Sequence, residues 1–131
     1  MTMSPELDST HELCTIAARA AAGKKADDVL ILDVGNVLAI TDSFVIASAQ
    51  SDRLVRTIAE EIEQQIKDSG GPAPLRVEGV KEGQWVLMDY GDFVVHVFLE
   101  ETRRFYDLER LWQDAPRVAW EESRPAMAGG K

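Results

Sequence analysis

The sequence has few of the features that tie a chain to an oxidising compartment or to a membrane. Its only cysteine, Cys14, cannot form an internal disulfide, so we expect the protein in a reducing, cytoplasmic environment. No apolar run approaches the roughly 18 residues that a membrane-spanning helix needs. Residues 1–6 contain no basic stretch followed by an apolar one, so no signal peptide is expected.

Positive charge is also scarce. Lysine and arginine number 14 against 23 aspartates and glutamates, which gives a net charge of −9. General nucleic-acid binding and attachment to anionic membranes are disfavoured, because both depend on basic side chains. The charge favours a basic protein or a small molecule as partner, and an acidic chain can still act on a ribosome by docking on a basic ribosomal protein.

The length of 131 residues suits one domain, large enough to bury a core without a disulfide or metal. We expect this domain to occupy residues 1–116. After Pro116 the hydrophobic periodicity is lost and the chain ends in Gly129-Gly130-Lys131. Residues 117–131 are therefore predicted to form a mobile C-terminal tail.

Helical and strand patterns alternate within the domain. Helical spacing of apolar residues predicts an alanine-rich helix over residues 4–24 and a strongly amphipathic one over 51–69, each with a capping serine at its start. Short apolar runs predict strands, and two further segments look like short helical pieces. The strands are expected at 29–32, 44–47, 75–78, 85–90 and 93–99, and the helical pieces at 100–104 and 108–112. These elements predict an α+β domain.

A Gly91-Asp92 turn between the last two strands predicts a β-hairpin with a defined register. Alternation places one nearly all-apolar set of side chains on the core face, against the 51–69 helix. This set comprises Val86, Met88, Tyr90, Phe93, Val95 and Val97. The opposite face mixes large apolar groups with a carboxylate and an imidazole, namely Trp85, Leu87, Asp89, Val94, His96 and Phe98.

The mixed face has two interpretations. It is either a second core layer, with Asp89 and His96 hydrogen-bonded inside it, or a surface that binds a partner. Large aromatic groups rimmed by polar ones are typical of interfaces. The predicted partner-binding residues are Trp85, Leu87, Asp89, His96 and Phe98.

Other groups of polar residues give little indication of a metal site or a catalytic site. His11 and Cys14 are spaced for one helical face, but zinc requires three or four ligands. Asp89 and Asp92 flank a turn, where aspartate is common for backbone reasons. We therefore expect no metal, no cofactor and no catalytic residue. The arginines of the segment after the hairpin are expected to be solvated and paired with nearby glutamates; they are Arg103, Arg104 and Arg110.

Four segments resemble a known family. They are Thr41-Asp42-Ser43-Phe44-Val45-Ile46, Ser51-Asp52-Arg53-Leu54-Val55-Arg56-Thr57-Ile58-Ala59, the hairpin from Trp85 to Phe98 preceded by Glu78-Gly79, and Arg104-Phe105-Tyr106-Asp107-Leu108-Glu109-Arg110-Leu111-Trp112. Together they are similar to the ribosomal silencing factor family, RsfS, also called Iojap-related proteins. The likeness spans about residues 9–116, and the hairpin with its closing segment is its most specific part.

The resemblance implies a function. Members bind large-subunit ribosomal protein number fourteen on the face that meets the small subunit, block the joining of the subunits, and repress translation when nutrients are short. It also implies a cytoplasmic homodimer. The implied fold is a mixed sheet of about five strands with flanking helices, related to nucleotidyltransferases but without their catalytic residues.

That relationship supplies one alternative, a nucleotidyltransferase-like enzyme. Such enzymes need two or three carboxylates to hold magnesium and a Gly-Ser cradle for phosphate. Here Phe44 follows Asp42 where a second carboxylate would be needed, and Gly35-Asn36 is not followed by a Gly-Ser pair. We therefore expect no enzyme activity. A homodimeric scaffold with no role on the ribosome is the other alternative.

Overall fold

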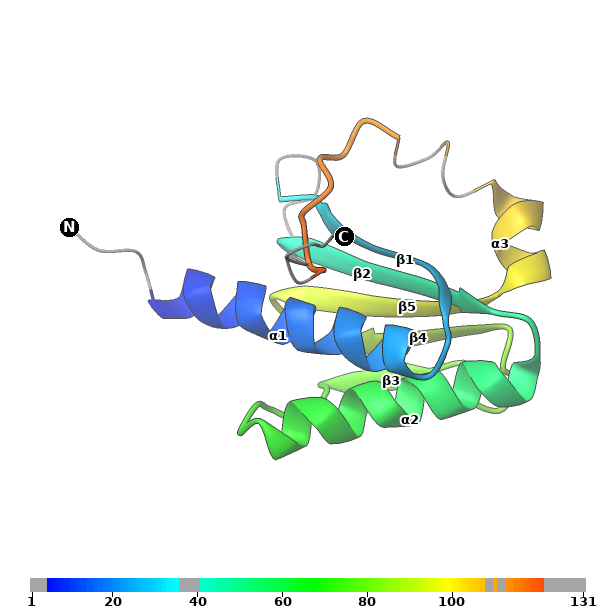
Figure 1. Cartoon of the computed structure of the whole chain (residues 1–131), viewed down its shortest axis with the longest axis horizontal. Helices are drawn as coiled ribbons and strands as arrows, with labels where there is room; N and C mark the ends of the chain where they lie inside the picture. Colours follow the sequence, from blue (N-terminus) through cyan, green and yellow to red (C-terminus); the bar gives the residue numbers. More distant parts are fainter. Residues whose placement is uncertain (1–4, 36–40, 108–109, 111–112, 122–131) are drawn as a thin grey trace, which may run out of the picture.

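The computed structural model describes residues 5–35, 41–107, 110 and 113–121 (Figure 1). In chain order the elements are α1 (Pro5–Gly23), β1 (Asp27–Asp33), β2 (Ser43–Ala49), α2 (Asp52–Asp68), β3 (Arg76–Glu78), β4 (Trp85–Asp89), β5 (Phe93–Leu99) and α3 (Glu100–Tyr106). They match the predicted order, and the strand boundaries differ from the predicted ones by a few residues at most. The predicted helical piece at 108–112 lies mostly outside the described residues.

The five strands form one mixed sheet in the order β1-β2-β5-β4-β3. β2 pairs in parallel with β5, and the other neighbouring strands are antiparallel. Figure 1 shows α1 and α2 side by side on one face of this sheet, with α3 at one end. The predicted α+β fold with a mixed five-stranded sheet is confirmed.

The face beneath the two long helices, called here the inner face, carries the main core. The buried side of α2, formed by Val55, Ile58, Ile62 and Ile66, joins one cluster with the inward residues of the hairpin. Those residues are Val86, Met88, Tyr90, Phe93, Val95 and Val97, as the hairpin pattern predicts. Small side chains of α1, including Ala17 and Ala21, complete the cluster.

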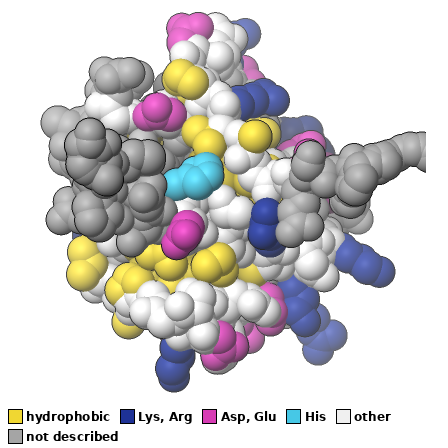
Figure 2. Space-filling model, turned by 60° about the vertical axis from the view of Figure 1, so that its left-hand side comes forward, with side chains coloured by type: hydrophobic (Ala, Val, Ile, Leu, Met, Phe, Trp, Pro, Cys, Tyr) yellow, Lys and Arg dark blue, Asp and Glu magenta, His cyan; other side chains and the backbone are white. Residues whose placement is uncertain are grey.

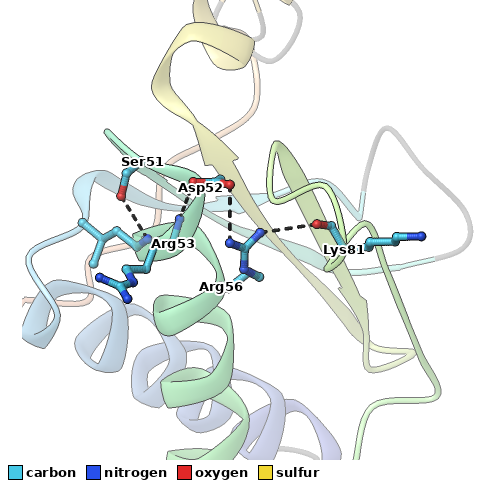
Figure 3. A network of polar contacts seen from close by, with 6 residues as sticks. Ser51, Asp52, Arg53, Arg56 and Lys81 are labelled. Atoms are coloured by element: carbon cyan, nitrogen blue, oxygen red, sulfur yellow. Dashed lines mark hydrogen bonds and ion pairs between the residues drawn. The ribbon is translucent and has the colours of Figure 1, made fainter.

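The start of α2 is fixed by its own side chains and by a distant loop (Figure 3). Ser51 caps the helix, because its Oγ accepts a hydrogen bond of 3.1 Å from the amide of Leu54. Arg56 forms an ion pair of 3.4 Å with Asp52 and donates, also at 3.4 Å, to the carbonyl of Lys81. Arg56 therefore holds the loop that leads into β4 against the first turn of α2.

A smaller cluster lies on the opposite, outer face of the sheet. It comprises Leu32, Val34, Phe44, Ile46, Phe98 and Ala115. Ala115 comes from the segment after α3, which Figure 1 shows passing over this face. The outer face is thus partly covered by the chain itself.

The expectation that Arg103 is solvated is wrong. Its side chain is buried, and its Nη1 donates to the carbonyl of Asp28 at 3.1 Å and to the hydroxyl of Ser48 at 3.0 Å. Arg103 thereby attaches α3 to the first two strands. The other two arginines are exposed as expected, with Arg104 3.6 Å from Glu100 and Arg110 3.3 Å from Asp107.

Residues 117–121, which the sequence assigns to a tail, lie beside β1. The amide of Asp33 donates to the carbonyl of Pro116 at 2.8 Å, and the amide of Val118 donates to the carbonyl of Ile31 at 2.8 Å. The indole of Trp120 donates to the carbonyl of Val29 at 3.1 Å. This segment covers the outer edge of β1, whereas residues 122–131 lie outside the described part of the chain.

The described helices include none that is both long enough and apolar enough to cross a membrane.

Truncation of Ile62 tests the packing of α2 on the sheet. Ile62 is fully buried, so Ile62→Ala should lower the free energy of unfolding by about 2–5 kcal/mol, measured by urea denaturation. Glu60→Ala, on the exposed side of the same helix, is the control and should change it by less than about 0.5 kcal/mol. An equally small loss for Ile62→Ala would show that α2 packs on the sheet through a different side of the helix.

Candidate functional site

The β4–β5 hairpin has the predicted register, and it places the five predicted partner-binding residues on the outer face. Trp85 pairs with Phe98, Leu87 with His96, and Asp89 with Val94. The turn is closed by the amide of Tyr90, which donates to the carbonyl of Phe93 at 3.0 Å. The five side chains therefore share one surface.

Burial divides this set into an exposed rim and a covered interior. Trp85 is 37% exposed, and Leu87 and Asp89 are half-buried. His96 is only 8% exposed and Phe98 2%, and Phe98 belongs to the outer-face cluster. Trp85 is thus available for direct contact, while His96 and Phe98 lie beneath it as support.

A hydrogen bond connects the rim to the interior. The indole Nε1–H of Trp85 donates to Nδ1 of His96 at 3.1 Å, and the rings of Trp85 and Phe98 lie 4.9 Å apart, centroid to centroid. Burial lowers the pKa of His96 from its usual 6.5 to about 4, so the ring is neutral at physiological pH. Because Nδ1 accepts from an indole, which can only donate, the ring proton resides on Nε2. That Nε2 is buried without a hydrogen-bond partner in the described part of the structure.

Asp89 has partners within the chain. One carboxylate oxygen accepts a hydrogen bond of 2.9 Å from the amide of Gly91, and the other lies 3.6 Å from Nε of Arg76. The first contact shapes the hairpin turn, and the second joins β4 to β3. A basic group on a partner would therefore compete with Arg76 for this carboxylate.

Two exposed aromatic residues of α3 extend the rim, and sequence reasoning missed them. Tyr106, 54% exposed, has its ring centroid 5.9 Å from that of Trp85, and Phe105, 79% exposed, lies 5.0 Å from Tyr106. We call Trp85, Phe105 and Tyr106 the aromatic patch. Buried Arg103 anchors α3 on its sheet side, which leaves the two rings facing outward. The adjacent aromatic pair in a strongly charged segment was the available signal.

His11 and Cys14 line a separate hollow of about 330 Å³ between α1, the end of β1 and the start of β2. His11 is exposed, whereas burial raises the pKa of the Cys14 thiol to about 12, so this thiol is not a reactive one. Figure 2 shows a histidine on this end of the molecule with acidic side chains near it. Within the described ranges, no three His, Cys, Asp or Glu residues come together as a metal-binding group.

The same hollow contains a pair of carboxylates that the sequence did not reveal. Asp33 and Asp42 each have an oxygen within 3.6 Å of the point where a Cβ on Gly35 would stand. Asp33 also accepts a hydrogen bond of 3.1 Å from the amide of Gly35. Asp42 therefore has a carboxylate neighbour from β1, although Phe44, two residues further along the chain, is apolar and buried.

The lowered pKa of His96 predicts a pH-dependent stability. The folded state resists protonation of His96, whereas the unfolded state accepts the proton. His96 therefore contributes to the free energy of unfolding near neutral pH, and this contribution is lost as the pH falls from about 6.5 towards 4. Between about pH 7.5 and pH 5 this residue should account for a loss of about 2 kcal/mol in unfolding free energy.

The control for this prediction uses the second histidine. His96→Asn keeps an acceptor for Trp85 but does not titrate, so its stability should fall less on acidification than that of the parent. His11→Asn, at an exposed position, should retain the parental pH dependence. Chemical denaturation across the pH range measures both, and identical slopes for the parent and His96→Asn would contradict the assignment.

Comparisons with known proteins agree with this fold. The sequence model described as "Ribosomal silencing factor during starvation" matches residues 7–130. The "Ribosomal silencing factor RsfS" of Bacillus subtilis is 46% identical over 101 residues, which cover 77% of this chain and 85% of that protein. The protein of the same name from Halalkalibacterium halodurans is 40% identical over 113 residues, covering 86% and 96%.

A solved structure shows that the likeness holds for the fold as well as for the sequence. The crystal structure of a protein from Chromobacterium violaceum superimposes with a TM-score of 0.74 at 30% sequence identity, and the match covers 86% of this chain and 92% of that one. The likeness in sequence thus extends to the arrangement of helices and strands over nearly the whole molecule. The chain belongs to the RsfS family of ribosomal silencing factors.

Proposed function

We propose that this protein silences ribosomes by binding large-subunit ribosomal protein number fourteen on the face that meets the small subunit. Occupation of that face blocks subunit joining sterically and represses translation when nutrients are limiting. The names of the relatives support a ribosomal silencing role, and the specific partner and the steric block follow from the family resemblance.

The observation that carries the proposal is the aromatic patch. Trp85, Phe105 and Tyr106 come from β4 and α3 and form a chain of ring contacts at the surface. Tryptophan and tyrosine provide a large contact area at a low cost in conformational entropy and are enriched among residues that dominate binding energy. Leu87 and Asp89 lie on the same face, while His96 and Phe98 support Trp85 from beneath.

Charge favours a basic partner. The net charge of −9 gives long-range attraction to a basic ribosomal protein and repulsion from bare ribosomal RNA. Near the patch, the carboxylates of Glu101 and Asp107 are exposed, and Asp89 can exchange Arg76 for a partner's lysine or arginine. The interface then combines an aromatic centre with an acidic margin.

The remaining parts of the proposal follow from the same family membership. The protein acts in the cytoplasm, forms a homodimer and uses no cofactor. It acts by occupying a surface and catalyses no reaction. The relatives are named as silencing factors and not as enzymes, which supports this.

Truncation of Trp85 tests the docking surface. Trp85→Ala should weaken binding to the isolated ribosomal protein about thirtyfold or more, the effect of losing a residue worth about 2 kcal/mol. Titration calorimetry measures the affinity, and thermal unfolding of the same sample measures stability. In a second assay, large ribosomal subunits are mixed first with the protein and then with small subunits. A larger fraction of the subunits should join in the presence of Trp85→Ala than in the presence of the parent protein.

Trp120→Ala is the matched control. Trp120 is partly buried and also donates its indole N–H, to the carbonyl of Val29, but it lies beside β1, away from the patch. Its truncation should lower stability while leaving the affinity unchanged. Full binding by Trp85→Ala, or a loss explained entirely by unfolding, would show that the outer face is a second core layer only. A parent protein that binds neither the partner nor the large subunit would instead favour the scaffold alternative.

A nucleotide-transfer assay tests the absence of enzyme activity. Asp33 and Asp42 line the same hollow and make the test informative, because paired carboxylates are the feature such enzymes share. The purified protein with magnesium should incorporate no nucleotide into protein or nucleic acid, and Asp42→Ala should behave identically. Incorporation that disappears in Asp42→Ala would overturn the proposal that this fold has no catalytic role.

A further inference from the structure

The short helix α3 carries two of the three rings of the aromatic patch, but its own sequence does little to hold it in place. It has seven residues, and an isolated helix of that length is marginal in water. No side chain caps its start at Leu99. Phe105 and Tyr106 are exposed, and Arg103 is the only buried side chain among the seven described residues of the helix. The orientation of α3 therefore depends on the groups that hold Arg103.

An irregularity in β1 provides the first of these groups. Between Asp27 and Leu30 the pairing with β2 shifts register, which marks a β-bulge. Asp28 lies in the bulge with a φ of +50°, a conformation that aspartate adopts more readily than most residues. The extra residue of a bulge is left out of the ladder, and the carbonyl of Asp28 accepts instead from Nη1 of Arg103 at 3.1 Å. The bulge thus supplies an acceptor for α3.

Ser48 of β2 provides the second group. Its hydroxyl accepts a hydrogen bond of 3.0 Å from the same Nη1 and donates to the carbonyl of Asp27 at 3.2 Å. Ser48 is 0% exposed and Arg103 4%. A buried charged donor is costly to leave without acceptors, so the guanidinium stays where these two acceptors are. One nitrogen of Arg103 is therefore attached to β1 and to β2 at once.

The same serine begins a row of side chains that leads to the aromatic patch. Ser48 pairs with Phe98 across β2 and β5, and Phe98 pairs with Trp85 across β5 and β4, so the three stand side by side on the outer face. Arg103 contacts the first member of this row, and the ring of Tyr106 lies 5.9 Å from the last. Because Arg103 and Tyr106 are three residues apart, they lie on one side of the helix. The helix spans the row, attached at one end and presenting a ring at the other.

We propose that Arg103 is a positioning residue for docking, which fixes α3 so that the aromatic patch is preorganised for the partner. Because it is buried, Arg103 acts without touching the partner. Side chains and segments that become ordered on binding weaken the affinity, and a helix that is already fixed has lost this freedom beforehand. The inference rests on the proposed docking function and adds to it a residue that acts from beneath the surface.

The first test measures the order of α3 without a partner. Methionine is flexible and apolar and donates no hydrogen bond, so Arg103→Met should release the helix. In ¹⁵N relaxation, the backbone order parameters of residues 101–106 should fall from about 0.85 to below about 0.6, while those of α2 stay unchanged. Arg104→Met removes the same charge from the exposed side of α3, where Arg104 lies 3.6 Å from Glu100, and should leave the helix ordered.

The second test is a double-mutant cycle on binding to the isolated ribosomal protein, measured by titration calorimetry. Arg103→Met should weaken binding about tenfold, because α3 and its two rings must then be ordered on docking. In a background that lacks both rings, Phe105→Ala with Tyr106→Ala, the same substitution should change the affinity by less than about twofold. A general loss of stability would weaken binding alike in both backgrounds, so the difference identifies positioning of the rings. Arg104→Met, the control for charge, should bind like the parent.

Ser48→Ala guards against an Arg103 variant that does not fold. It removes one acceptor and leaves the carbonyl of Asp28 to Arg103, so it should produce the same two changes on a smaller scale, with binding about threefold weaker. Thermal unfolding is measured for every variant, and affinities are compared at a temperature where all of them are folded.

The results that would overturn this proposal differ from those that would overturn the silencing role. Unchanged order parameters in Arg103→Met overturn it, and so does an equal loss of affinity with and without the two rings. The silencing role fails if the parent does not bind the ribosomal protein, or if Trp85→Ala binds as tightly as the parent. A released α3 in Arg103→Met would even then support Arg103 as the residue that positions the patch, and only the ribosomal partner would be overturned.

Discussion

The register of the β4–β5 hairpin decides which side chains face the helices and which face outward. Tyr90 and Phe93 close its turn, and from there alternation carries Val86, Met88, Val95 and Val97 into the core beneath α2. The same alternation forces Trp85, Leu87, Asp89 and His96 onto the other face. A slip of one residue would exchange the two sets, burying a carboxylate under α2 and exposing the main core. The position of the proposed docking surface is thus a consequence of the packing of the core.

The outer face has to meet two opposing requirements: its apolar side chains must be covered for stability, and some apolar surface must stay exposed for a proposed partner. Phe98, Phe44 and Ile46 need cover, and the segment containing Ala115 supplies it. A partner needs exposed apolar surface, which Trp85, Phe105 and Tyr106 provide at the margin of that cover. The Trp85–His96 hydrogen bond joins the two regions and holds the indole in place before a partner arrives. A preorganised side chain loses less entropy on binding, so in the proposed complex the buried imidazole would favour binding without contacting the partner.

Local patterns predicted the parts of this fold that local interactions determine. The cap at Ser51, the apolar stripe of α2 and the Gly91-Asp92 turn all act within a few residues, and each appears where the sequence indicates. The resemblance to RsfS proteins supplied the mixed sheet and the ribosomal role, which periodicity alone does not contain.

The features that the sequence did not predict depend on contacts between distant segments. Arg103 is buried because carbonyl and hydroxyl acceptors from Asp28 and Ser48, far away in sequence, surround its guanidinium. Residues 116–118 have no strand periodicity, yet they bond to β1 because that edge offers unpaired backbone groups. Phe105 and Tyr106 lie near Trp85 because Arg103 attaches α3 to the sheet, and Asp33 and Asp42 line one hollow because β1 pairs with β2. Each of these depends on contacts between distant segments, which a single sequence does not display.

Arg76 connects the sheet edge to the face with the aromatic patch. Its guanidinium lies 3.6 Å from Asp89, on that face, and 3.5 Å from Glu78, its neighbour along β3. Exposed ion pairs contribute little to stability, so a basic group of a partner could replace Arg76 at Asp89 at little cost to the fold. Arg76 would still keep Glu78 as its partner within the chain, so no charge is left unpaired by the exchange.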